Sequence, residues 1–431
     1  MTLWHFSVTE RKLAATGSEF AEQEGIPMSE APHTVIIGGG LAAAKTAETL
    51  RNGDYAGEIT IVAGESLVPY ERPPLSKEYL LGKSAREDAF VHPAEWYAEH
   101  QVNLLLGQKA TAIDRGARTV TLADGQQLAY SSLVLATGSA PRVPGIPGED
   151  LPGVYSLRTF PDSDNLRGLF SHGGHLVIVG AGWIGLEVAA AARAADVKVT
   201  VVAPNDVPLG NILGTEIGHH FRALHEKNGV TFKLGTSVSE ILSDGGNAAG
   251  VMTDDGAVPG TAVLLAVGAV PETSLAAAAG LAVDNGIVVD SSLRTADPYI
   301  LAAGDVANAE HSTLGRLRVE HWDNAIRQGK LAAATILGKG DVYDWQPYFY
   351  TDQYDLGMEY VGHASGKSDV VIRGSLDSGE FIAFWLDSGV VSAAMNVNIR
   401  DVNDTLRALV GQRIAPEKLA DESIPLDQLG A

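Results

Sequence analysis

Cysteine is absent from all 431 residues of the chain. The chain therefore forms no disulfide bond, offers no thiolate to a metal ion or an iron–sulfur cluster, and has no thiol pair to relay electrons. Long apolar runs are absent as well: the run that begins at Leu176 is interrupted by glycines and by Glu187, short of the roughly 18 residues that span a bilayer. Residues 1–27 mix charged and small side chains and do not resemble a secretory signal, so we expect a cytoplasmic protein.

Positive charge is scarce. The chain has 31 Lys and Arg residues against 53 Asp and Glu residues, a net charge of −22. This balance repels phosphate backbones and anionic lipid, so we expect neither nucleic acid nor membrane as a partner. A composition of 45% hydrophobic and 19% charged residues is that of a globular protein, and the length predicts two or three domains.

Two segments of the chain share one design. Residues 34–43 and 175–190 each run from an apolar strand through a glycine turn into an alanine-rich helix, and further β-branched strands follow at 58–62 and 197–202. Each segment therefore predicts a strand–helix–strand unit. Two such units predict an α/β protein with two doubly wound, Rossmann-like domains built on parallel sheets.

The spacing in the two turns is that of dinucleotide-binding loops. Gly38, Gly40 and Ala43 fit the pattern G-x-G-x-x-A, and a second set fits G-x-G-x-x-G: Gly180, Gly182 and Gly185. In this pattern the first glycine permits a tight turn, the second lets backbone N–H groups approach a pyrophosphate, and the third position must be small for packing. Two turns imply two dinucleotides, and FAD with a nicotinamide is the most economical pair.

An acidic residue that binds the ribose is expected about 20 residues beyond each turn. Glu65 is the candidate at the first turn. At the second turn the strand ends in Ala203, and the next acid is Asp206, which is as readily explained as a solvated loop residue. No arginine replaces the acid, so we favour NADH and leave NADPH open.

The pattern changes near Tyr348. Strand-like hydrophobic runs follow, separated by Asp-Ser-Gly turns, and a final helix is expected to start near Asp401 with three apolar residues on one face: Val402, Leu406 and Leu409. These features predict a small α+β domain at the C-terminus. Three histidines in one helical stretch lack the spacing of a zinc site, and we interpret them as surface residues: His219, His220 and His225.

Longer motifs carry a family resemblance. Residues 70–77 read YERPPLSK, 135–139 read LATGS, 302–306 read AAGDV, 319–325 read VEHWDNA, and 352–362 read DQYDLGMEYVG. In sequence and order these strings resemble the FAD-dependent ferredoxin reductases that serve Rieske dioxygenases and bacterial cytochromes P450. The resemblance extends from about Thr34 to the C-terminus.

The resemblance implies the glutathione reductase fold, in which a nicotinamide domain is inserted into the FAD domain. The predicted parts are a poorly ordered N-terminal extension (1–30), the FAD domain (31–144 and 271–345), the nicotinamide domain (145–270) and a C-terminal interface domain (346–431).

The resemblance also implies a role for particular residues. Lys77 is placed near the flavin ring, where a fixed cation would stabilise the electron-rich reduced flavin, and the alternative is a solvated lysine behind Ser76. Glu187 is placed near the nicotinamide, and a glutamate in so apolar a helix requires a polar partner. The remaining flavin contacts would be Arg72, Thr137, Gly138, Gly304, Asp305, Glu320, His321 and Trp322, and the remaining nicotinamide contacts would be Ile184 and Gly268.

The absence of cysteine excludes the activities of this fold that pass electrons through a thiol. Disulfide reductases and peroxidases of this fold pass electrons through cysteine, so in this chain electrons must leave a reduced flavin directly. The leading hypothesis is an enzyme that passes electrons from NADH to a [2Fe–2S] ferredoxin or a rubredoxin. The alternatives are a reductase of a small acceptor, such as a quinone or monodehydroascorbate, and a slow NADH-binding protein that resembles apoptosis-inducing factor. The net acidity is unfavourable for docking an acidic ferredoxin, unless a local basic rim is formed by Arg316, Arg318, Arg327 and Lys330.

Overall fold

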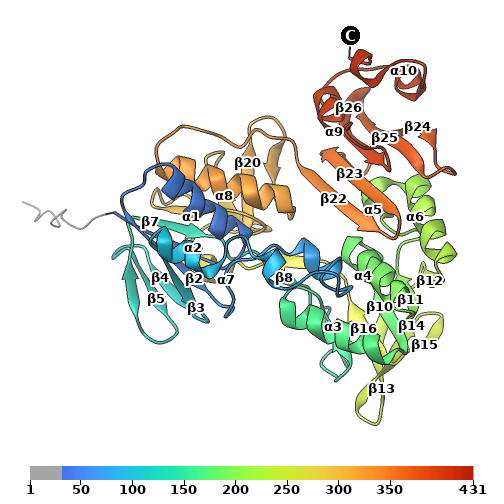
Figure 1. Ribbon diagram of the computed structural model, residues 1–431, viewed down its shortest axis with the longest axis horizontal. Helices are drawn as coiled ribbons and strands as arrows, with labels where there is room; N and C mark the ends of the chain where they lie inside the picture. Colours follow the sequence, from blue (N-terminus) through green and yellow to red (C-terminus); the bar gives the residue numbers. More distant parts are fainter. Residues whose placement is uncertain (1–31, 431) are drawn as a thin grey trace, which may run out of the picture. The chain divides into compact units, whose positions relative to one another are not determined.

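The structure is a computed structural model that describes residues 32–430, so the predicted extension at 1–30 lies outside the described residues. Two five-stranded parallel sheets and one five-stranded antiparallel sheet dominate the described part (Figure 1). The predicted α/β class, with two Rossmann-like sheets and a C-terminal α+β unit, is confirmed.

The first parallel sheet has the strand order β19-β7-β1-β2-β3. Its inner strands are mostly apolar and buried, as expected for a parallel sheet covered on both faces, while the edge strand β3 is only partly buried. The bounds are β1 His33–Ile37, β2 Glu58–Ala63, β3 Val102–Leu106, β7 Ser132–Leu135 and β19 Ile300–Ala302. The helices and short 3-10 turns associated with this part are α1 Leu41–Asn52, η1 Pro73–Ser76, η2 Glu87–Ala89, α2 Ala94–Glu99, α7 Ser274–Ala278 and α8 Trp322–Ile336.

The second parallel sheet repeats this arrangement, with the order β12-β11-β10-β16-β9. β10 takes the central place that β1 has in the first sheet, and each is followed by a glycine turn and a helix. The bounds are β9 Val154–Tyr155, β10 His175–Val179, β11 Lys198–Ala203, β12 Val230–Leu234 and β16 Ala262–Leu265, with helices α3 Phe160–His172, α4 Trp183–Ala194, α5 Gly210–Leu213 and α6 Thr215–Lys227.

Two crossing segments connect these sheets. They are β8 (Ser139–Pro141) and β17 (Ala269–Pro271), which pair antiparallel as a two-stranded ribbon. The smaller sheets are β4 Ala110–Asp114, β5 Thr119–Leu122 and β6 Gln127–Ala129; β13 Val238–Asp244, β14 Asn247–Thr253 and β15 Gly256–Pro259; and β18 Ile287–Val289, β20 Ala307–His311 and β21 Gly315–Leu317.

The C-terminal sheet is antiparallel throughout, in the order β22-β23-β26-β25-β24. The Asp-Ser-Gly turns at 377–379 and 387–389 close its hairpins as predicted. The helix predicted from near Asp401 is α9, with Leu406 and Leu409 buried, but it is not the final helix, because two further short helical segments follow it. The bounds are β22 Tyr348–Gln353, β23 Leu356–Gly362, β24 Asp369–Ser375, β25 Glu380–Asp387, β26 Val390–Val397, α9 Asn403–Leu409, α10 Pro416–Ala420 and η3 Leu426–Gln428.

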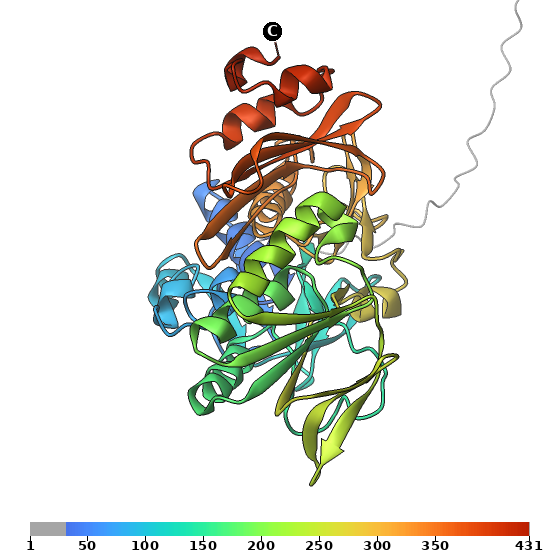
Figure 2. The ribbon, with the colours of Figure 1, turned by 90° about the vertical axis from the view of Figure 1, so that its right-hand side faces the viewer.

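One apolar core joins the helices of the second parallel sheet to the C-terminal sheet. One face of the C-terminal sheet packs on α9 and α10, and the other packs on α5 and α6 (Figure 2). In the first part, α1 and α8 approach so closely that a Cβ at Gly329 would lie 2.5 Å from the carbonyl oxygen of Ala42. Because α8 begins at Trp322, this contact fixes the position of Trp322 relative to the first glycine turn.

Within residues 32–430, no helix combines the length and the apolar composition that a membrane crossing requires.

Candidate functional site

A cavity of about 730 Å³ collects most of the residues that the sequence singles out. Its walls come from the turn between β1 and α1, the segment around η1, the first turn of α4, the start of α8 and the strand β22. The predicted site residues in its lining are Gly38, Gly40, Glu65, Arg72, Lys77, Thr137, Gly138, Ile184, Glu187, Gly304, Asp305, Glu320, His321 and Trp322.

The other predicted residues lie outside this lining: Ala43, Gly180, Gly182, Gly185 and Gly268. Ala43 is buried behind the first turn. A Cβ at Gly185 would lie 2.4 Å from the carbonyl oxygen of Gly180, so the third position of the second turn is under a packing constraint. The second glycine turn therefore belongs to the same fold pattern but does not line this cavity.

The glycine turns have the geometry that backbone anion binding requires. Gly38 and Gly180 have φ values of 126° and 110°, and a Cβ at either would lie 2.0 or 2.3 Å from a carbonyl oxygen of the neighbouring strand end. Gly40 and Gly182 are different: nothing lies within 4 Å of a Cβ built there. Both begin a helix without a side-chain cap, so each helix N-terminus opens onto free space.

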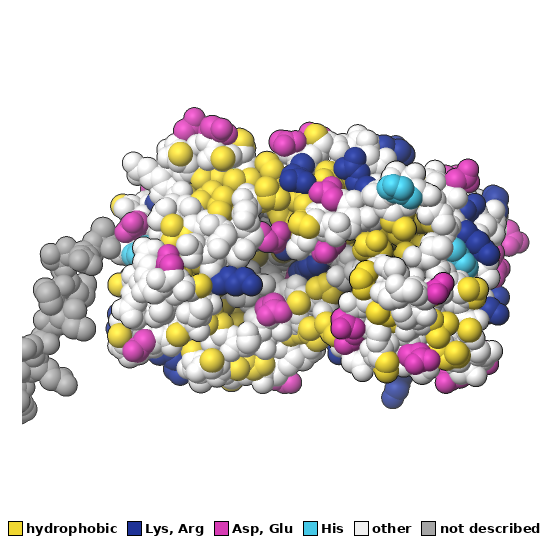
Figure 3. Space-filling model, turned by 90° about the horizontal axis from the view of Figure 1, so that it is seen from below, with side chains coloured by type: hydrophobic (Ala, Val, Ile, Leu, Met, Phe, Trp, Pro, Cys, Tyr) yellow, Lys and Arg dark blue, Asp and Glu magenta, His cyan; other side chains and the backbone are white. Residues whose placement is uncertain are grey.

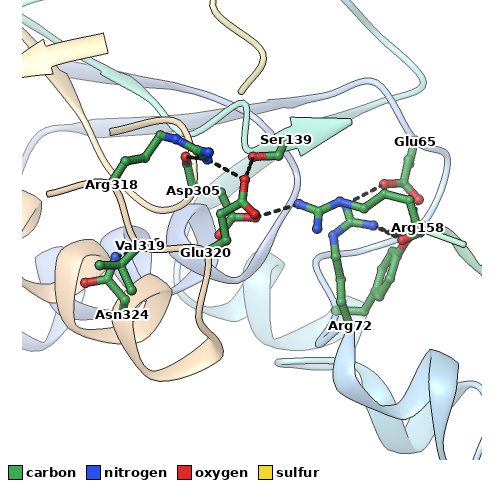
Figure 4. Close-up of polar contacts among 10 residues, drawn as sticks. Glu65, Arg72, Ser139, Arg158, Asp305, Arg318, Val319, Glu320 and Asn324 are labelled. Atoms are coloured by element: carbon green, nitrogen blue, oxygen red, sulfur yellow. Dashed lines mark hydrogen bonds and ion pairs between the residues drawn. The ribbon is translucent and has the colours of Figure 1, made fainter. Parts of the chain in front are cut away.

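A network of ion pairs follows one wall of the cavity (Figure 4). Arg72 Nη2 lies 3.2 Å from Glu65 Oε1, and the Tyr70 hydroxyl donates to Glu65 Oε2 at 2.6 Å. Arg72 also donates to the carbonyl oxygen of Arg158, whose own Nη2 lies 2.7 Å from Asp305 Oδ2. Burial raises the pKa of Tyr70, so its hydroxyl stays protonated and acts as a donor.

The same wall continues to the predicted segment at 319–325. Glu320 Oε1 accepts hydrogen bonds from Arg318 and from the Ser139 hydroxyl, the latter at 3.2 Å (Figure 4). Arg318 also donates to the carbonyl oxygen of Asp305 at 3.2 Å. Glu320 and Asp305 are therefore held by cations of the chain itself.

The cavity lining also includes a buried ion pair. Lys77 Nζ lies 2.6 Å from Glu187 Oε1, and the two side chains are 9% and 5% exposed. The hydroxyls of Ser76 and Thr351 donate to the same carboxylate, the Thr351 bond measuring 2.6 Å. The polar partner predicted for Glu187 is thus present, whereas the alternative of a solvated Lys77 is wrong, since Lys77 is buried.

His321 and Trp322 carry polar atoms that the chain leaves unsatisfied. Of the described side chains, His321 Nδ1, Trp322 Nε1 and Arg158 Nε are among those buried without a hydrogen-bond partner. Loss of hydration lowers the pKa of His321 to about 4, which leaves the ring neutral at pH 7. Unsatisfied polar atoms in the lining of a cavity with an open glycine turn fit a large polar ligand with a phosphate group, and a dinucleotide such as FAD meets that description.

The prediction of three surface histidines is partly wrong. His219 is exposed and His220 is half-buried, but His225 is fully buried. His225 Nε2 lies 2.8 Å from Gln353 Oε1, and the Tyr354 hydroxyl lies 3.2 Å from His225 Nδ1. The helix pattern placed His225 on α6 correctly but did not reveal that β22 covers it.

Three residues of the site carry no signal in the sequence. Arg158 lies just before the capping box of α3, which predicts a helix start but not a cavity wall. Thr351 and Tyr350 lie in β22, and the Tyr350 ring is 5.7 Å from Lys77 Nζ. Their alternation in a strand predicts that they point to opposite faces, but not that one face meets α4.

The predicted basic rim is partly neutralised by nearby groups. Arg318 is bound to Glu320, Arg327 Nε lies 2.7 Å from Asp323 Oδ2, and Arg316 donates to backbone carbonyl groups. Lys330 is exposed. Together with Arg327 and Lys339, Lys330 lines a groove of about 560 Å³ at the far end of α8.

Two family models match the chain. Residues 32–329 match the pyridine nucleotide-disulphide oxidoreductase model, and residues 348–430 match the reductase C-terminal model. These matches agree with the two parallel sheets and the two glycine turns of the structure, all of which indicate a protein that binds two dinucleotides. The chain belongs to the pyridine nucleotide-disulphide oxidoreductases, in the group that carries the reductase C-terminal domain.

Proteins similar to this chain include ferredoxin reductases of oxygenase systems. The chain is 40% identical over 396 residues to the anthranilate 1,2-dioxygenase system ferredoxin–NAD(+) reductase component of Burkholderia cepacia, covering 91% of this chain and 98% of that one. A crystal structure of a ferredoxin reductase from Rhodopseudomonas palustris has a TM-score of 0.89 at 35% identity, covering 93% of this chain and all of that one, that is 100%. The covalent putidaredoxin reductase–putidaredoxin complex gives a TM-score of 0.88 at 34% identity, with coverages of 93% and 98%.

Proposed function

We propose that this protein is an FAD-dependent ferredoxin reductase, which takes a hydride from NADH, or from NADPH, and passes electrons to an iron–sulfur protein of the ferredoxin or rubredoxin type. The observation that carries the proposal is the cavity itself: an uncapped glycine turn, a buried Lys77–Glu187 pair and unsatisfied donors converge there in a chain without cysteine. The names of the similar reductases support the same activity.

The residues suited to hold FAD are those of the first cavity wall. The turn at Gly38 and Gly40, with the N-terminus of α1, would take the pyrophosphate, and Glu65 would take the ribose hydroxyls. Asp305 and the segment from Glu320 to Trp322 would take the polar groups of the flavin. The remaining lining residues in this role are Arg72, Thr137, Gly138 and Gly304. FAD, when bound, accepts a hydride as two electrons and can release them one at a time.

Lys77 and Glu187 form the reactive side of the cavity in this proposal. A buried ammonium group stabilises negative charge that develops on a neighbouring ligand, and its effect is large because water is excluded. Glu187 fixes the position of Lys77 and is itself held by two hydroxyl donors. Tyr350 covers the same side, with its ring near the Lys77 ammonium group.

The second turn is suited to the nicotinamide dinucleotide. Gly182 begins α4 with open space above it, while Gly180 and Gly185 are needed for the turn itself. Ile184, 43% exposed, and Glu187 lie in the first turns of α4 and face the first cavity, and Gly268 follows the adjacent strand β16. Ala203 is buried at the end of β11 and Asp206 is exposed beyond it, so neither of these two positions supplies a cation for a 2′-phosphate, which favours NADH. We retain the predicted domain boundaries near residues 144, 270 and 345 as part of this proposal.

The purified protein tests the proposal directly. We expect a yellow protein with stoichiometric FAD, NADH-dependent reduction of ferricyanide, and reduction of cytochrome c that increases when a [2Fe–2S] ferredoxin is added. Fast quinone reduction without any ferredoxin effect would instead identify a small-molecule reductase. A colourless protein that takes up no FAD and oxidises neither NADH nor NADPH would refute the proposal.

A further inference from the structure

A chain of buried polar groups extends from the Lys77–Glu187 pair away from the cavity. Thr351 donates to Glu187 at 2.6 Å, and Gln353 Nε2 donates to Thr351 Oγ1 at 3.2 Å. Beyond Gln353 the chain continues to His225, at 2.8 Å, and then to the Tyr354 hydroxyl, at 3.2 Å. The side chains of Thr351 and Gln353 are each 1% exposed, and that of His225 is 0% exposed.

The Glu187 carboxylate fixes the donor and the acceptor in every hydrogen bond of this series. An ionised Glu187 only accepts, so the Thr351 hydroxyl must give it its single proton. Gln353 must then present its NH₂ group to Thr351 and its oxygen to His225, which requires the His225 tautomer protonated at Nε2. The free Nδ1 accepts from Tyr354, and burial, which lowers the pKa of His225 to about 4, keeps the ring neutral.

This series of hydrogen bonds joins three separate parts of the fold. Lys77 follows η1, Glu187 and His225 lie on α4 and α6, and the donors Thr351 and Gln353 lie on β22. Buried polar groups that are fully satisfied rigidify their surroundings, and each link here depends on the next. The amide group of Gln353 is a poor carrier of protons. The hydrogen-bonded series is therefore better suited to hold groups in place than to conduct a proton.

We infer that Gln353 and His225 are positioning residues, which hold the Thr351 hydroxyl on Glu187 and so fix the carboxylate that pairs with Lys77. The inference rests on the proposed function, because it assigns a role in tuning the FAD that the cavity is proposed to bind. With the Thr351 donor removed, less of the carboxylate's charge is compensated, and reduction of a flavin beside it becomes less favourable.

Substitutions at Thr351 and Gln353, followed by measurement of the flavin midpoint potential, distinguish a positioning role from simple packing. We expect Thr351→Val to lower the equilibrium constant for two-electron reduction of bound FAD about tenfold, a fall of about 30 mV in midpoint potential. Gln353→Glu keeps the side-chain volume but accepts where Gln353 donates, so it should lower the potential as well. Thr351→Ser retains the hydroxyl and is the matched control, with an expected potential equal to that of the wild type.

A double-mutant cycle tests whether Thr351 acts through Glu187. In a Glu187→Gln background, Thr351→Val should change the midpoint potential no further. Equal shifts in both backgrounds, or unchanged potentials in both Thr351→Val and Gln353→Glu, would overturn the inference. If Thr351→Val does not fold, Gln353→Glu carries the same comparison.

Failure of the proposed function gives a different result. It would appear in the wild type as a protein without FAD, before any variant is made. The coupling between Thr351 and Glu187 would still be measurable in the flavin-free protein as non-additive losses in the free energy of unfolding. Additive losses there would contradict the hydrogen bond on which the inference rests.

Discussion

At the scale of single residues, the buried pair of Lys77 and Glu187 is both a stability element and a functional one. Removal of one partner leaves a buried charge uncompensated, which costs about 3–5 kcal/mol, whereas removal of both is often nearly neutral. We therefore expect Lys77→Met to lower the free energy of unfolding by about 3 kcal/mol, and Lys77→Met/Glu187→Leu to recover most of it. Urea unfolding of the flavin-free protein at pH 7 measures both. Equal losses in the single and double variants would show that the charge of Glu187 is compensated without Lys77.

His225 makes a separate prediction about pH. Its pKa is lowered to about 4 in the folded protein, because burial disfavours the charged ring. Between about pH 4 and 6.5 the unfolded chain binds a proton at this site that the folded protein does not, so stability falls as the pH falls. The slope from His225 reaches about 1.4 kcal/mol per pH unit in this window.

Unfolding measured from pH 7 to pH 4 tests this prediction. His225→Phe should be less stable than the wild type at pH 7 but should lose less stability on acidification. His219→Phe, at the exposed histidine of the same helix, is the control and should leave the slope unchanged. A wild-type slope retained in His225→Phe would mean that His225 is not the group that titrates.

At the scale of elements, the strand–turn–helix units contain two kinds of glycine. A Cβ at Gly38 would lie 2.0 Å from a backbone oxygen, but at Gly40 it would meet nothing within 4 Å. We expect Gly38→Ala to prevent folding or to cost several kcal/mol. Gly40→Ala should fold normally and bind FAD at least tenfold more weakly, because its methyl group occupies the space reserved for the pyrophosphate.

The second unit supplies a matched comparison. Gly182→Ala should leave FAD content unchanged and raise the KM for NADH, since this turn is proposed to bind the nicotinamide dinucleotide. FAD content from the visible spectrum, the KM and the free energy of unfolding separate these outcomes. Normal FAD affinity in Gly40→Ala, or loss of FAD in Gly182→Ala, would contradict the assignment of the turns.

The sequence predicts features that depend on local spacing along the chain, but not features that depend on contacts between distant elements. The strands, the turns at Gly38 and Gly180 and the hairpins of the C-terminal sheet follow from spacing along the chain, and the structure contains them. The burial of His225 and the donor role of Thr351 follow from contact between α4, α6 and β22. Such contacts join positions far apart in sequence, so no local period or motif encodes them. Glu187 is the intermediate case, because an acid in an apolar helix signals that a partner exists but does not identify it.

At the scale of the whole molecule, the net charge of −22 opposes the approach of an acidic partner. On the face drawn in Figure 3, acidic and basic side chains are interspersed, with no continuous basic surface. The groove at the far end of α8 is lined by three cations, Arg327, Lys330 and Lys339, together with the acids Asp341 and Asp344. Arg327 is already paired with Asp323, so the exposed Lys330 and Lys339 are the remaining cations of the groove. It lies on α8, whose first turn forms part of the cavity wall.

We predict that an acidic ferredoxin approaches at the groove, with steering by the exposed Lys330 and Lys339. Lys330→Glu should lower ferredoxin-dependent cytochrome c reduction about tenfold at low salt, with a smaller effect at high salt where charges are screened. NADH–ferricyanide turnover should be unchanged, because a small acceptor does not need the groove. Lys198→Glu makes the same change in net charge at an exposed lysine at the start of β11 and should have little effect. Similar losses in both variants would indicate that total charge, and not this groove, governs the encounter.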